Sequence, residues 1–199
     1  MPPKPKFTRE QIVEHALNIV ERDGIKALTA RELGKEMGSS PRPIFTVFKS
    51  MDELCTEVFS AARNRFEKFV LSKHDPGPFF RNVGMRMVAF AAESPRLYQL
   101  LFMSETGAVS DGFDRLYGRL GKTADVCVGS IMAEHDINKE QAKRVFECLW
   151  IYTFGIGALC ATGVCSFSKE KIRQMLAFEF KSVLYQVVNP GLDFLVEKK

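Results

Sequence analysis

Apolar residues recur at helical spacing along almost the whole chain, and this periodicity constrains the fold more than any other feature. The first predicted helix, which Thr8 opens and Gly24 caps, has Ile12, Ala16, Leu17, Ile19 and Val20 on its apolar face. Strand signals, meaning period-two alternation that ends in Asn-Gly or Asp-Gly, are nearly absent. The sequence therefore predicts an all-α protein.

Capping signals divide the first part of the chain into short helices. Three polar residues stand at capping-box spacing from a Glu or Gln: Thr8 with Gln11, Thr29 with Glu32, and Ser50 with Glu53. Ser40-Pro41 predicts a cap followed by proline at the first position of a third helix, which ends near Phe48. The pattern predicts three short helices with tight connections, and then a longer helix that starts at Ser50.

The Pro- and Gly-rich stretch at 75–78 is the clearest break in the chain. Beyond it, the spacing predicts long helices over about 113–134, 139–163 and 168–188, the second of them capped by Asn138. We expect two domains, a small head at 1–52 and a larger helical body at 53–199, because the chain is long enough to bury a sizeable core.

Residues 148–168 contain no charged residue, and this is about the length of a membrane span. The segment also contains polar residues and glycines, which suit a helix buried between other helices. Thr153, Gly157 and Ala161 at four-residue spacing indicate the close approach of another helix. We expect a core helix and no membrane role.

Composition excludes several other classes of protein. With 46% hydrophobic residues and a net charge of +4, the chain is not disordered, and its N-terminus lacks the apolar stretch of a signal peptide. The five cysteines have no framework spacing, so we expect reduced core thiols in a cytoplasmic protein. No motif of an enzyme, metal site or cofactor site is recognisable, although a zinc site or a redox pair at Cys160 and Cys165 stays open as a minor alternative.

The segment from Thr29 to Lys49 has the pattern of a helix-turn-helix. Gly38 allows a turn where a side chain would clash, and the helix after it can present its N-terminal residues to base edges in a major groove. Arg42 is best placed to read guanine with two hydrogen bonds, whereas Thr29 and Arg31 suit phosphate contacts. The residues expected to contact DNA are Thr29, Arg31, Ser39, Ser40, Arg42, Thr46 and Lys49.

Basic residues also stand before and at the start of the first helix. Lys4, Lys6 and Arg9 occur with no acidic residue before Glu10. Such an arm suits contact with a groove or with the phosphate backbone.

The first fifty-five residues resemble the N-terminal pattern of the TetR family of transcriptional regulators. The resemblance is carried by Thr8-Arg9, Ile12, Ala16-Leu17, Gly24, Thr29, Gly38-Ser39, Phe48 and Leu54. It implies double-stranded DNA with a palindromic operator as one partner, a small-molecule effector as another, and a homodimer formed by the last two long helices. Where the family often has Tyr, His and Lys, this chain has Phe45, Val47 and Met51, so phosphate contacts are lost.

The second part of the chain resembles the family more weakly. Ser94 to Tyr98 and Trp150 to Gly155 are similar to a subgroup with a Trp…His-Gly motif, but Phe154 replaces the histidine. A regulator of this kind needs an apolar effector cavity. The residues expected to line it are Met87, Phe90, Leu101, Phe102, Trp150 and Phe154, which predict an apolar or aromatic effector.

Together these features predict a transcriptional regulator, a repressor that a small effector releases from its operator. A helical protein-interaction module that has lost operator binding is the alternative. A third alternative is a carrier or enzyme that binds apolar ligands within a helical bundle. No group of residues in the sequence supports this alternative.

Overall fold

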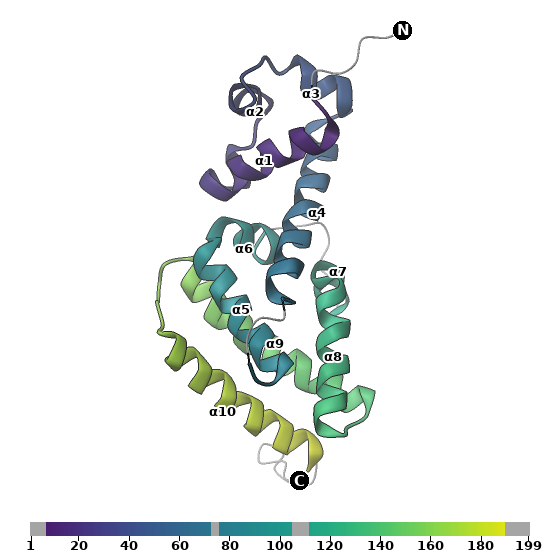
Figure 1. The fold of residues 1–199 in the computed structure, drawn as a ribbon, viewed down its shortest axis with the longest axis vertical. Coiled ribbons are helices and arrows are strands. Elements are labelled where there is room, and N and C mark those ends of the chain that lie inside the picture. The colour runs from purple at the N-terminus through teal and green to yellow at the C-terminus, as the bar shows by residue number, and fades with distance from the viewer. Residues whose placement is uncertain (1–6, 73–75, 105–111, 190–199) are drawn as a thin grey trace, which may run out of the picture. The chain divides into compact units, whose positions relative to one another are not determined.

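The computed structural model describes residues 7–72, 76–104 and 112–189, and every regular element in these ranges is helical (Figure 1). The prediction of an all-α fold is confirmed. The elements are α1 (Arg9–Asp23), a 3-10 turn η1 (Ile25–Ala27), α2 (Ala30–Glu36), α3 (Arg42–Val47), α4 (Met51–Val70), α5 (Phe79–Glu93), α6 (Pro95–Phe102), α7 (Asp114–Leu120), α8 (Lys122–His135), α9 (Lys139–Ala161) and α10 (Lys169–Val188).

Most predicted caps are present. The side chain of Thr8 accepts a hydrogen bond from the Gln11 amide at 3.2 Å and closes a capping box on α1, and Asn138 does the same for α9. The prediction that Ser40 caps the third helix is wrong. That helix begins at Arg42 after Pro41, and no side chain caps it.

Packing divides the chain into two compact units: unit 1 comprises Met1–Phe66 with Ser94–Gly107, and unit 2 comprises Glu67–Glu93 with Ala108–Lys199. This division follows contacts between elements. The division by function at residue 52 stays a prediction.

Unit 1 is built around α1, which contacts α2, η1 and α6, while α2 contacts α3. The Ser94 hydroxyl donates to a Glu21 carboxylate oxygen at 3.3 Å, which links α6 to α1. The Phe102 ring packs edge to face against Phe66, with ring centroids 5.1 Å apart, and in a tilted arrangement against Tyr98 at 5.0 Å. The fully buried apolar side chains of this unit include Ile12, Ala16, Val20, Leu33, Ile44, Leu54, Val58, Phe66, Leu97 and Leu101.

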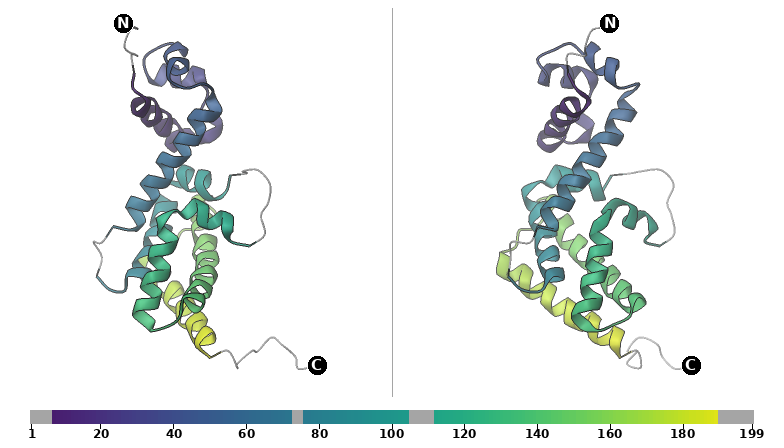
Figure 2. Two further views of the ribbon diagram at one scale, coloured as in Figure 1. Left: turned by 90° about the vertical axis from the view of Figure 1, so that its right-hand side faces the viewer. Right: turned by 45° about the vertical axis from the view of Figure 1, so that its right-hand side comes forward.

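Unit 2 is built around α9, which contacts α5, α8 and α10 (Figure 2). Thr153, Gly157 and Ala161 are all buried, as their spacing predicted for a helix closely approached by others. Among the described residues, α9 is the one helix long and apolar enough to cross a membrane by length and composition. Its burial against three helices matches the predicted core role.

The prediction of one long helix over about 113–134 is wrong. This segment forms two helices, α7 and α8, which are joined at Gly121. Gly121 has φ +56° and ψ −128°, a backbone conformation that glycine adopts without a steric penalty. The pattern of apolar residues continues through the break, so periodicity alone did not indicate it.

The cysteines are free, but the expectation that all of them lie in the core is wrong. Cys127 is buried, and burial raises the pKa of its thiol to about 12. Cys148 is exposed, and Cys55, Cys160 and Cys165 are half-buried.

Candidate DNA-binding and effector sites

The helix-turn-helix predicted from the sequence is formed by α2 and α3. The Thr29 hydroxyl caps α2 by accepting a hydrogen bond from the Glu32 amide at 3.2 Å. The turn then closes through backbone hydrogen bonds, in which the amide of Gly38 donates to Lys35 and that of Ser39 donates to Gly34. These bonds fix the position from which α3 starts.

Two glycines make the turn possible, for different reasons. Gly38 has φ +60°, and a Cβ there would meet no atom within 4 Å, so glycine serves its backbone conformation and avoids no clash. At Gly34, in the interior of α2, a Cβ would lie 3.0 Å from the Pro41 nitrogen and 3.1 Å from the Ser39 oxygen. The close approach is therefore at Gly34, a residue that the sequence analysis missed. The sequence signal for this position is a glycine inside a short helix. Glycine lowers helix stability there, so its presence indicates a packing requirement.

Buried and exposed side chains separate cleanly on α3. Ile44 is fully buried, and Phe48 at its C-terminal end is 1% exposed. These two anchors hold the helix on the core and leave its other side free. Of the residues predicted to contact DNA, the structure exposes Thr29, Arg31, Ser40, Arg42, Thr46 and Lys49 and leaves Ser39 half-buried.

Phe45 adds an aromatic ring to the same helix. Its side chain is 51% exposed, which is unusual for phenylalanine. The hydroxyl of Thr46 donates to the Pro43 carbonyl at 2.7 Å and still can accept a hydrogen bond. The exposed side of α3 thus offers a guanidinium, a hydroxyl and a phenyl ring, and a phenyl ring can contact the methyl group of thymine.

Arg9, which the sequence analysis assigned to a basic arm, is engaged inside unit 1. Its guanidinium donates to Glu53 at 2.6 Å, to Glu57 at 2.7 Å and to the Val47 carbonyl at 3.1 Å. It also lies 4.2 Å from the centroid of the Phe48 ring. This cluster ties α1 to the end of α3 and to α4, so the charge of Arg9 is used for folding. Lys4 and Lys6, the rest of that arm, lie outside the described residues.

Glu53 is the centre of this cluster. It accepts hydrogen bonds from Arg9 and, through its other oxygen, from the Lys49 amide at 2.7 Å. These bonds hold the pKa of the Glu53 carboxyl below its usual range, with the Arg9 bond as the largest cause, and the two carboxylates raise the pKa of Arg9. The end of α3 is therefore positioned by a charged cluster next to the exposed Lys49.

The residues predicted to line an effector cavity are only partly brought together. Met87 and Trp150 line one cavity in unit 2, of about 10 Å³, together with Phe80, Phe146 and Leu149. This volume is close to that of one water-sized probe. Phe90 does not line this cavity and packs against Phe69 at 5.6 Å between ring centroids.

The other predicted lining residues are placed elsewhere. Leu101 and Phe102 belong to unit 1, where the Phe102 ring packs on Phe66. Phe154 is half-buried on α9 and is not among the residues around Met87. That these six residues line one effector site therefore stays a prediction.

No protein-family model matches the sequence, and no curated protein matches it. Solved structures do match the fold. A TetR-family member from Streptomyces coelicolor superposes with a TM-score of 0.62 at 16% identity, covering 89% of this chain and 98% of that one. Another TetR-family transcriptional regulator from the same organism gives 0.55 at 16% identity, covering 98% and 99%.

A third match is a variant of TetR from Acinetobacter baumannii, solved in complex with minocycline. Its TM-score is 0.59 at 12% identity, and the match covers 93% of this chain and 98% of that chain. The fold and the helix-turn-helix define an all-helical protein with the architecture of a helix-turn-helix regulator. More specifically, the chain has the fold of the TetR family of transcriptional regulators.

Proposed function

We propose that this protein is a DNA-binding transcriptional regulator, acting in the cytoplasm as a repressor on a palindromic operator. The observation that carries the proposal is the exposed side of α3, where Arg42 and Thr46 stand on a helix anchored by Ile44 and Phe48. The exposed Lys49 follows directly after this helix. A helix held in this way can enter a major groove, and Arg42 can pair with guanine. No catalytic role is part of the proposal.

A homodimer is part of this proposal, because a palindromic operator needs two reading helices. It is supported by exposed apolar side chains on the last two helices of unit 2. Ile151 on α9 is 58% exposed and Phe178 on α10 is 72% exposed. Leu159, Tyr185 and Val188 are exposed on the same two helices. Exposed apolar side chains of this size favour an interface.

We also propose that a small apolar or aromatic effector releases the repressor. The aromatic and aliphatic surroundings of Met87 and Trp150 support this chemistry. Because that cavity holds only about 10 Å³, an effector enters only if the helices around it move. A ligand that binds the opened conformation better shifts the protein toward it, and operator affinity falls by the same coupling factor.

Operator binding is tested by fluorescence anisotropy with the purified protein and the promoter next to its own gene. We expect salt-sensitive binding, and Arg42→Ala is expected to weaken it by about 1–3 kcal/mol, roughly fivefold to 150-fold. Lys26→Ala is the matched control, because Lys26 is an exposed cation of unit 1 outside the helix-turn-helix.

The alternative function is a protein-interaction module of the same fold that has lost operator binding. It is favoured by Phe45, Val47 and Met51, which supply no charge at positions where the family often contacts phosphate. It predicts that the folded dimer shows no salt-sensitive binding and that Arg42→Ala leaves cellular activity unchanged. That pair of results would refute the proposed regulator.

A further inference from the structure

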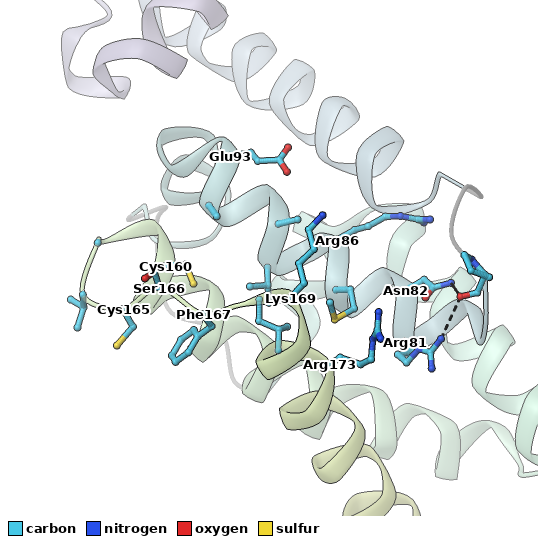
Figure 3. A pocket seen from close by; sticks show the side chains of 18 residues that line it. Arg81, Asn82, Arg86, Glu93, Cys160, Cys165, Ser166, Phe167, Lys169 and Arg173 are labelled. Carbon is cyan, nitrogen blue, oxygen red and sulfur yellow. Dashed lines mark hydrogen bonds between the residues drawn. The ribbon is translucent and has the colours of Figure 1, made fainter.

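A cavity of about 790 Å³ in unit 2 is not used by the proposed function. It lies between α5, the end of α9, the segment that joins α9 to α10, and the start of α10 (Figure 3). Its volume is in the usual range of small-ligand sites. None of Met87, Phe90, Trp150 and Phe154 lines it.

The charges around this cavity are strongly unequal. Among the residues that the structure describes, four cationic side chains line it, Arg81 and Arg86 from α5 and Lys169 and Arg173 from α10, against one carboxylate, that of Glu93. Glu93 stands twelve residues after Arg81 on α5, which is about 18 Å along the helix axis. Figure 3 shows Arg81 and Arg173 near Asn82 in that view, whereas Glu93 is drawn apart from them.

The cationic groups are partly fixed in place. Arg86 is 8% exposed, and its Nη1 donates to the carbonyl oxygens of Val70, at 3.2 Å, and Ser72, so it is held at the end of α4. Arg81 donates to the Pro76 carbonyl at 3.3 Å. Arg173 has an ion pair with Glu170 at 3.3 Å, but both side chains are more than half exposed, and such pairs contribute little. The guanidinium of Arg173 can therefore turn to an incoming anion at small cost.

Most of the remaining lining residues are apolar, and Asn82 and Ser166 are the polar ones among them. Val88 and Ile172 belong to a buried cluster, against which Met85, Cys160 and Phe167 pack. In the view of Figure 3, Cys160 and Phe167 lie toward the end of the cavity opposite Arg81 and Asn82. The cavity thus has a cationic end and an apolar end.

We propose that this cavity binds an amphipathic anion, a carboxylate or phosphate monoester with an apolar chain. The anionic group pairs with Arg81, Arg86 and Arg173, because guanidinium groups bind carboxylate and phosphate through two parallel hydrogen bonds. The apolar chain packs on Val88 and Phe167, and its removal from water stabilises the complex. Partial enclosure strengthens the charge pairing relative to open solvent.

This site is separate from the effector cavity around Met87 and does not depend on operator binding. Direct binding to the full-length protein, measured by isothermal titration calorimetry without DNA, therefore tests it. A failure to bind would refute the site and leave the DNA result untouched. The probes are octanoate and octyl phosphate, with 1-octanol and inorganic phosphate as matched ligands that each lack one half of the chemistry.

We expect saturable binding of octanoate or octyl phosphate at one site per chain, and at least tenfold weaker binding of 1-octanol and inorganic phosphate. Tighter binding of octyl phosphate assigns a phosphate ester, and tighter binding of octanoate assigns a carboxylate; either supports the site. Equal affinity for octanoate and 1-octanol, equal affinity for octyl phosphate and inorganic phosphate, or no binding of either amphipathic anion would overturn it.

Variants locate the site. The double variant Arg81→Gln with Arg173→Gln removes two lining cations but keeps Arg86, which is fixed at the end of α4. Its control is Arg144→Gln with Lys171→Gln, which loses the same charge at exposed positions on α9 and α10 outside the lining. We expect at least a tenfold loss of affinity in the first double variant and less than a twofold loss in its control. An equal effect of both would place the anion elsewhere and contradict the proposal.

Discussion

At the residue scale, Arg9 shows what a sequence pattern leaves open. A basic residue at the start of a helix suits a DNA-binding arm, and the positions three and four residues on, Ile12 and Val13, offer no acidic partner. Its partners Glu53 and Glu57 follow 44 and 48 residues later and reach it only through the packing of α1 on α4. Gly38 was recognised because its place in a turn is a local signal, although the reason for glycine there is a positive φ and not the clash that was predicted. Long-range partners of single side chains could not be predicted.

The charged cluster predicts a specific dependence of stability on pH. Because the folded pKa of Glu53 is lowered by Arg9 and by the Lys49 amide, its stabilising effect is complete above the unfolded pKa of about 4.3 and disappears as pH falls through the folded value. We expect Glu53→Gln to lower the melting temperature at neutral pH and to lower it less as pH falls below about 4. Thermal unfolding monitored by circular dichroism measures the difference.

Glu14→Gln is the control for this experiment, because Glu14 is an exposed carboxylate on α1 away from the cluster. It should change the melting temperature little at any pH. If the two variants gave the same difference from wild type across the pH range, the cluster would not stabilise unit 1 as its geometry indicates.

At the element scale, helices and breaks with strong local signals were predictable, and the break between α7 and α8 was not. α9 combines an Asn138 capping box with small residues at four-residue spacing, and both features are local. The boundary between α7 and α8 depends on the backbone of Gly121, inside a run whose apolar spacing continues. The short α3 begins one residue later than its proline pattern indicated, because Pro41 and not Ser40 stands at the N-cap.

The turn of the helix-turn-helix predicts that Gly34→Ala destabilises the head. Alanine is the better helix former by about 1 kcal/mol, but its Cβ would press on the backbone at Pro41 and Ser39, which cannot move without shifting α3. Overpacking of this kind costs about 1–3 kcal/mol. We therefore expect a lower melting temperature and weaker operator binding, measured by circular dichroism and anisotropy.

Gly129→Ala in α8 provides the matched substitution, since a Cβ there meets no atom within 4 Å and the position is exposed. It should leave stability unchanged or raise it by up to about 1 kcal/mol. A Gly34→Ala variant as stable as Gly129→Ala would show that the turn adapts, and that the short distances at Gly34 do not limit it.

At the scale of the whole molecule, periodicity and capping predicted the class of fold, but not the division by packing. The segment with α6 joins unit 1 although it follows α5 of unit 2. Leu101 and Phe102 therefore belong to a different unit from Met87 and Trp150, because helical spacing gives the buried face of each helix but not its neighbour. The cationic cavity was missed for the same reason, because its arginines come from α5 and α10, more than eighty residues apart.

The proposed homodimer gives the last prediction. Burying one exposed phenylalanine contributes about 1.5–3 kcal/mol, and each 1.4 kcal/mol is a tenfold change in the dissociation constant. Replacing Phe178, which is 72% exposed on α10, by Glu also places a charge in the interface. We expect Phe178→Glu, and likewise Ile151→Glu on α9, to raise the dimer dissociation constant at least tenfold in analytical ultracentrifugation, moving the species from twice 22.5 kDa toward the monomer. Val126→Glu, at an exposed apolar position on α8, should leave the dimer intact. A wild-type chain that sediments as a monomer would refute the dimer, because two reading helices on one palindrome require two copies.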